Sequence, residues 1–314
     1  MEQRKNSLRL EWRYLLCSKF IILIAMLVFI MNGVLLFIDY QYVTMNYEDY
    51  MYTRNYYIQN NLDMDIDMNQ DTYSVVVDGD TTTIENPLLY HYSEMSKALY
   101  VISPVYAVAH IEELSIVIFP ALFAIIGVFL ATYDIKNKVY RHKLQRFGRK
   151  LYVQTKMVTG FCLVTAANIF SVITARIMSA FLYSYVCTYV TIEDFAQSSP
   201  ERLSSDMQKI VIMLLISYTY YSVGLFIGSL TANALVSSVG ILAFLYMMPI
   251  ISKYELINCC RAIMKEFFEF FGLIDINEYK TVSFGVAMGI IIIWILITNL
   301  AVFVIVQKKS GDRA

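Results

Sequence analysis

Long apolar runs that contain no charged residue dominate the hydrophobic pattern of this sequence. Six such runs lie at residues 20–38, 114–133, 157–175, 210–230, 234–251 and 282–306. A helix needs about 20 predominantly apolar residues to cross the hydrocarbon core of a bilayer, because each backbone N–H and C=O has to bond within the helix there. The pattern therefore predicts an all-α membrane protein with six transmembrane helices.

The third run continues beyond its first charged residue. After Arg176 the chain stays apolar and aromatic to Ile192, so we treat 157–192 as one helix with an outer extension. A rise of about 1.5 Å per residue places Arg176 near the far membrane interface. There its side chain can reach the headgroups, and a buried functional charge is the alternative.

The polar segments between the runs predict smaller elements. We expect an amphipathic interfacial helix at 1–19, an extracellular domain at 39–113, a cytoplasmic loop at 134–156, an outer loop at 193–209, outer re-entrant or interfacial helices at 252–281 and a cytoplasmic tail at 307–314. In the first segment, Leu8, Trp12 and Leu15 alternate with arginines, a pattern typical of the membrane interface. In the second, Val75–Val77 and Thr81–Ile84 flank Asp78-Gly79, which predicts a small β-hairpin.

Charge sets the expected orientation. The chain is 58% hydrophobic and 16% charged, with a net charge of −1, whereas about a quarter of the residues of a soluble domain are charged. With the N-terminus inside, the inner segments hold 16 Lys or Arg and four acids, and the outer segments hold eight Lys or Arg and 22 acids. Because basic residues gather on the cytoplasmic side, both termini are expected in the cytoplasm.

Motifs of enzymes and metal proteins are missing from the sequence. There is no Gly-Lys-Ser/Thr of a phosphate-binding loop, so the chain has no nucleotide-binding motif of its own. His91, His110 and His142 are widely separated, the five cysteines lack ligand spacing, and the acidic stretch 63–71 lacks the glycine and glutamate of a calcium loop. We expect no catalytic residue, no metal site and no cofactor in this chain. The spans contain no acid, which disfavours ion-coupled transport.

Hydroxyl-bearing and small residues supply the polarity inside the spans. The stretch "SYTYYSVGLFIGSL" contains Tyr218, Tyr220 and Tyr221, which are a possible substrate path, with ordinary helix packing as the alternative. Pairs of glycines four residues apart allow two helices to approach closely. The candidates for this role are Gly224, Gly228, Gly285 and Gly289.

The arrangement resembles the permease subunits of ABC-2 type exporters. Members of that family have an amphipathic N-terminal helix, six spans, a basic loop between spans two and three, a short turn between spans four and five, and outer helices before span six. Asp134, Leu144, Arg149 and Lys156 match the family's loop residues in order, whereas its Gly-Thr is missing near Lys138 and Phe147-Gly148 replaces its proline.

The resemblance implies a type V exporter-like permease fold in the bacterial plasma membrane. A separate cytoplasmic ATPase subunit would bind ATP and Mg²⁺, a second permease chain would form a homodimer or heterodimer with this one, and no nucleic acid would be involved. The substrate would be a peptide or drug-like amphiphile. The alternative is a membrane sensor or scaffold whose extracellular loop binds a ligand.

The loop 134–156 would couple the ATPase to the spans. A helix carrying Tyr140, Leu144, Phe147 and Leu151 on one stripe could fit a groove of the ATPase, with Asp134 capping that helix. The residues expected to serve this coupling are Asp134, Tyr140, Leu144, Arg146, Phe147, Arg149 and Lys156. The basic residues could instead set only the topology and bind lipid.

Overall fold

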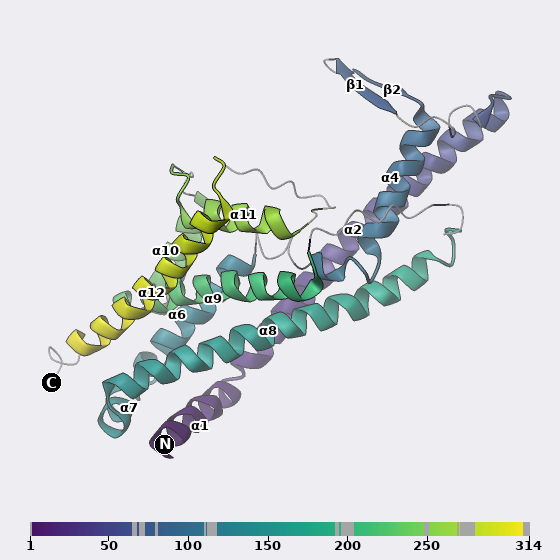
Figure 1. The fold of residues 1–314 in the computed structure, drawn as a ribbon. Helices are drawn as coiled ribbons and strands as arrows, with labels where there is room; N and C mark the ends of the chain where they lie inside the picture. Colours follow the sequence, from purple (N-terminus) through teal and green to yellow (C-terminus); the bar gives the residue numbers. More distant parts are fainter. Residues whose placement is uncertain are drawn as a thin grey trace. The chain divides into compact units, whose positions relative to one another are not determined.

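The structure is a computed structural model that describes residues 2–64, 68, 73–78, 81–109, 111, 118–191, 195, 204–247, 251–268, 270 and 280–309. The elements, shown in Figure 1, are α1 (Glu2–Cys17), α2 (Phe20–Gln59), β1 (Ser74–Asp78), β2 (Thr81–Glu85), α4 (Pro87–Ile102), α6 (Phe119–Lys136), α7 (Tyr140–Phe147), α8 (Arg149–Val186), α9 (Asp206–Thr231), α10 (Ala234–Met247), α11 (Leu256–Phe267) and α12 (Phe284–Lys309). They form two compact units. The first contains Met1–Phe29, Ile111–Ser171 and Leu203–Ala314, and the second Ile30–His110 and Val172–Arg202.

The fold class is that of a helical membrane protein. Within the described residues, five helices are long and apolar enough to cross a bilayer, namely α2, α6, α8, α9 and α12. The expected fifth span, 234–251, contains α10, an apolar helix of 14 residues. Residues 248–250 of that run lie outside the described residues, so a sixth span stays a prediction.

Two helices extend well beyond the apolar runs that predict them. α2 has 40 residues and continues 21 residues past the expected end of its span, and α8 begins at Arg149 instead of 157. No glycine or proline lies between residues 34 and 59, so nothing in the backbone interrupts α2. The described part of the expected outer segment 39–113 is therefore more helical than the sequence suggested.

The second unit joins residues 30–59 of α2 to α4 and the end of α8. Its core is a cluster of eight buried residues: Val43, Met95, Ala98, Leu99, Ile102, Val186, Val190 and Phe195. Tyrosines pack around this cluster, and Tyr42 donates a hydrogen bond to Glu94 at 2.9 Å. The predicted hairpin is present, because β1 pairs antiparallel with β2 and Val75 faces Ile84.

In the first unit, glycines bring α6 and α9 into close contact. A Cβ added at Gly224 would lie 1.9 Å from the carbonyl oxygen of Ala124, and one at Gly127 would lie 2.2 Å from that of Tyr221. Gly228 similarly lies against Val128 and Ala131. In contrast, a Cβ added at Gly285 or Gly289 of α12 would meet no described atom within 4 Å.

α11 lies in the expected outer helical segment 252–281 and carries two adjacent thiols. Cys259 and Cys260 are both buried and free. Burial raises the pKa of Cys259 to about 11 and that of Cys260 to about 12. Both thiols therefore stay protonated and act as packing groups. α11 ends at Phe267, and the following residue, Phe268, is extended.

The glycine contacts predict opposite effects of two similar substitutions. Gly224→Ala would force α9 away from the Ala124 carbonyl, and overpacking of this kind typically costs about 1–3 kcal/mol. Gly289→Ala meets open space and would gain helix propensity of up to about 1 kcal/mol. Thermal unfolding of the purified variants should show a lower midpoint for the first and an unchanged or higher midpoint for the second. Equal midpoints would contradict the α6–α9 contact.

Candidate functional site: a buried charge ring at the basic end

Two short turns shape the connection between α6 and α8. Lys138, with φ +58°, follows the end of α6, and Gly148, with φ +76°, separates α7 from α8. Residues with a side chain rarely adopt a positive φ, so glycine suits the turn between α7 and α8, and Lys138 is one of the exceptions. The expected stripe of Tyr140, Leu144, Phe147 and Leu151 is consequently wrong as a feature of one helix, because Leu151 lies on α8.

Four charged side chains meet inside this connection. The Lys143 ammonium lies 2.6 Å from Oε2 of Glu11 and 2.7 Å from Oδ1 of Asp134. The Lys156 ammonium pairs with Oε1 of Glu11 and lies 2.8 Å from Oδ2 of Asp134. Each carboxylate thus contacts both ammonium groups, and opposite charges alternate around a closed set. We call Glu11, Asp134, Lys143 and Lys156 the charge ring.

The charge ring is removed from solvent. Its four side chains are at most 6% exposed. They come from α1, α6, α7 and α8 in turn, so the ring ties four helices together. Asp134 was expected to cap the loop helix, and this is wrong. The N-cap of α7 is Val139, without a side-chain hydrogen bond, because the Asp134 carboxylate faces the two lysines.

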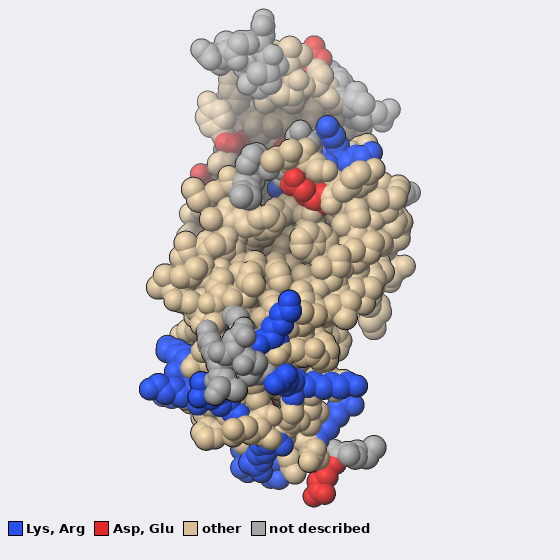
Figure 2. All heavy atoms as spheres, turned by 90° about the vertical axis from the view of Figure 1, so that its left-hand side faces the viewer, with Lys and Arg blue, Asp and Glu red and all other residues tan. Residues whose placement is uncertain are grey.

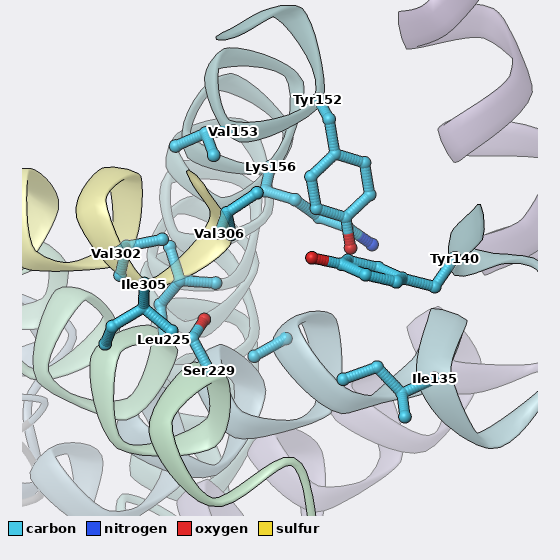
Figure 3. Close-up of a pocket in the computed structure, with 11 residues that line it drawn as sticks. Ile135, Tyr140, Tyr152, Val153, Lys156, Leu225, Ser229, Val302, Ile305 and Val306 are labelled. Carbon is cyan, nitrogen blue, oxygen red and sulfur yellow. The ribbon is translucent and has the colours of Figure 1, made fainter. Parts of the chain in front are cut away.

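Aromatic rings enclose the ammonium groups. Lys143 Nζ lies 4.6 Å from the ring centroid of Tyr14, and Lys156 Nζ lies 5.5 Å from that of Tyr152. Tyr140 packs edge-on against Tyr152 at 5.4 Å. Figure 3 shows both tyrosines beside Lys156, with their hydroxyl groups toward each other. They line a cavity of about 30 Å³ that α9 and α12 close on the other side, and such a volume has room for an ordered water.

Further contacts fix the first turns of α8. The Ser7 and Thr155 hydroxyl groups are 2.9 Å apart, and the Tyr221 hydroxyl donates to the Lys156 carbonyl oxygen at 2.9 Å. Arg149 donates to the Gln307 carbonyl oxygen at 3.3 Å. α8 therefore begins in contact with α1, α9 and α12 at once.

The charge ring has a simple energetic consequence. Burial of each ion costs several kcal/mol, and this is offset when its partners are close and hydrogen-bonded. With two acids and two lysines the ring is neutral. Loss of one member leaves a buried charge without compensation, which typically costs about 3–5 kcal/mol. All four helices must therefore be in place together.

Outside the ring, this end of the first unit is strongly cationic. Figure 2 shows Lys and Arg side chains gathered there. The exposed cations are Arg4, Lys5, Arg9, Arg13, Lys19, Lys136, Lys138, Arg141, Arg146, Arg149, Lys150 and Lys308. Among the described residues of 1–19, 134–156 and 307–314, Glu2 is the single exposed acid. The ring takes the other two described acids inside, so the described surface of this end is almost entirely cationic.

The seven residues expected to couple to an ATPase divide into two groups. Asp134 and Lys156 are buried in the ring and cannot touch a partner directly. Arg146 and Arg149 are exposed, and Tyr140, Leu144 and Phe147 are partly exposed. Sequence reasoning missed Glu11 and Lys143. The available signal was the spacing of Ser7, Glu11 and Leu15, which places a lone acid on one helical ridge.

The three tyrosines of the possible substrate path lie on α9. Tyr220 and Tyr221 are buried at 3% and 0% exposure, and Tyr218 stacks on Tyr221 with centroids 5.7 Å apart. The Tyr221 ring fills the space beside Gly160 of α8, where an added Cβ would lie 1.9 Å from it. Within the described chain, these contacts favour the packing alternative for Tyr221.

Comparison of the chain with protein-family models, curated proteins and solved structures finds no match. Among the described residues, no group of three or more His, Cys, Asp or Glu is placed to hold a metal ion.

A closed ring and two independent ion pairs respond differently to charge exchange. If Glu11–Lys143 and Asp134–Lys156 were separate pairs, Glu11→Lys with Lys143→Glu would restore stability. In the ring this exchange places a second carboxylate beside Asp134 and a second ammonium group beside Lys156, so we expect no rescue. Inversion of all four charges restores the alternation and should recover part of the stability that the exchange loses. Unfolding midpoints of these two variants and of Glu11→Gln test the ring, and rescue by the two-residue exchange would contradict it.

Proposed function

We propose that this chain is the membrane-spanning permease subunit of an ATP-driven exporter of the ABC-2 type, acting with a separate cytoplasmic ATPase. The observation that carries the proposal is the construction of α7. This short helix lies between two long apolar helices, is held from inside by Lys143, and presents cationic and partly exposed apolar side chains on its outside. A helix of this kind is suited to transmit force from a partner to the spans.

The charge ring supplies a physical route for that force. Lys143 joins α7 to Asp134 at the end of α6 and to Glu11 of α1, and the same two acids hold Lys156 of α8. Displacement of α7 would separate buried opposite charges unless α1, α6 and α8 move with it. In this proposal the four helices respond as one body when the ATPase binds ATP and Mg²⁺.

The outer face of α7 and the start of α8 would contact the ATPase. Arg146 is exposed and lies 5.4 Å from the Phe147 ring, and Arg149 is exposed beside the end of α12. Arginines pair well with carboxylates at interfaces, because the guanidinium group can donate two parallel hydrogen bonds. We assign these two arginines to the acids of the partner, and Tyr140, Leu144 and Phe147 to an apolar groove.

An ABC-2 permease subunit would have the following orientation and partner. The basic end would face the bacterial cytoplasm, a second permease chain would complete the substrate path, and the tyrosine-rich segment 39–113 would lie outside. The proposed substrate is a peptide or drug-like amphiphile, because tyrosine side chains offer such a molecule both an apolar ring and a hydroxyl group.

Charge reversal of the two arginines tests the contact with the ATPase. We expect Arg146→Glu with Arg149→Glu to weaken co-purification of the ATPase at least tenfold and to abolish ATP hydrolysis stimulated by the permease, because like charges then meet. The matched control is Lys253→Glu with Lys265→Glu. Both lysines are exposed, Lys253 before α11 and Lys265 on it. This control should keep both properties. A chain that purifies and functions with no ATPase would contradict the proposal and favour a sensor or scaffold.

A further inference from the structure

α1 carries two ridges of different chemistry. Ser7, Glu11 and Leu15, four residues apart, are buried at 5%, 4% and 2% exposure. Lys5, Arg9 and Arg13 have the same spacing, are offset by two residues, and are all exposed. At 3.6 residues per turn, an offset of two residues turns a ridge by about 200°. The cationic ridge therefore lies opposite the ridge that docks on α7 and α8.

The position of α1 in the chain limits what the cationic ridge can meet. Ser18 and Lys19 alone separate α1 from α2, whose first residues, from Phe20 onward, are an apolar run that can cross a bilayer. The end of α1 therefore lies next to the point where the chain would enter the membrane. Next to the cationic ridge, Leu16 is 62% exposed and Trp12 is partly exposed. A row of cations flanked by an apolar and an aromatic side chain suits the boundary between headgroups and acyl chains.

We propose that Lys5, Arg9 and Arg13 bind the headgroups of anionic phospholipids, and that Glu11 transmits this binding to α7. The lipid-binding part does not need an ATPase partner. The transmission deepens the proposed function, on which it rests for its physiological role, because it makes the position of the coupling helix depend on lipid charge.

The charge ring explains why the two ridges act together. α1 is joined to α7 through the Glu11–Lys143 pair and to α8 through the Glu11–Lys156 pair and the Ser7–Thr155 hydrogen bond. If α1 leaves, Asp134 stays with two lysines and the buried set carries one excess positive charge. Anionic lipid that holds α1 at the surface therefore also favours the closed ring and an ordered α7. Each surface cation contributes about a fivefold preference for an anionic membrane, so the ridge should contribute about a hundredfold.

Trp12 provides a built-in reporter for the lipid. In a Trp294→Phe background, Trp12 is the single tryptophan. The full chain in nanodiscs with equal fractions of brominated lipid should show stronger quenching of Trp12 when phosphatidylglycerol carries the bromine than when phosphatidylcholine does. Replacement of Lys5, Arg9 and Arg13 by glutamine should remove this difference. A matched variant that replaces Lys136, Arg141 and Lys150 by glutamine, three exposed cations at the same end, should keep it.

Hydrogen exchange of the α7 amides measures the transmission. In the unmodified chain, phosphatidylglycerol should slow exchange in α7 at least threefold relative to phosphatidylcholine, and the Lys5, Arg9, Arg13 variant should show no change. Glu11→Gln with Lys143→Met leaves the neutral Asp134–Lys156 pair. It should keep the lipid preference of Trp12 and lose the response of α7.

Each contrary result overturns a defined part of the inference. Equal quenching by the two lipids in the unmodified chain, or equal loss in the ridge and matched variants, refutes a lipid site on α1. An α7 response that persists in the Glu11 variant refutes transmission through the ring. Loss of ATPase binding by the ridge variant in pure phosphatidylcholine would make the ridge a protein interface instead. Absence of any ATPase leaves both measurements intact and refutes the proposed function alone.

Discussion

Neutrality of the buried charge ring is the constraint on which the basic end of this protein depends. Glu11, Asp134, Lys143 and Lys156 come from four helices, and none of them can be removed without leaving an ion in a poorly hydrated interior. The contribution of such a ring to net stability is modest, since desolvation offsets much of the attraction. We expect its main effect to be specificity, because every buried charge has its partners in this arrangement of α1, α6, α7 and α8.

The ring is continuous with the packing of the apolar helices. Lys156 enters the ring with its side chain and accepts a hydrogen bond from Tyr221 with its carbonyl oxygen. Tyr221 is fully buried on α9, and its own carbonyl oxygen lies against Gly127 of α6. A displacement at the charged end therefore reaches the α6–α9 contact through one tyrosine. This connection is the contact through which α7 would act on the spans in the proposed function.

Sequence reasoning located five long apolar helices and the hairpin but not the ring. Each of the five long apolar helices overlaps one of the apolar runs, because a helix that crosses a bilayer needs about 20 apolar residues. The runs do not mark where a helix ends, so α2 continues past the expected end of its span, and α8 both begins and ends earlier than the expected range 157–192. The Asp78-Gly79 hairpin was predictable because its signal is local. Glu11 and Lys143 are 132 residues apart, and an acid in an amphipathic helix is normally read as a surface group. Asp134 and Lys156 were selected through the family resemblance as coupling residues, and the structure places both side chains inside the ring.

Docking of α1 on the start of α8 is the central claim, and a disulfide tests it most directly. The Ser7 and Thr155 hydroxyl groups are 2.9 Å apart, so cysteines at both positions are close enough to bond. In a chain whose exposed Cys17 and Cys162 are replaced by serine, we predict that Ser7→Cys with Thr155→Cys cross-links efficiently in native membranes under mild oxidation. Arg9→Cys with Thr155→Cys, on the opposite ridge, should not. Failure of the first pair to cross-link, or equal cross-linking of both, would contradict the account.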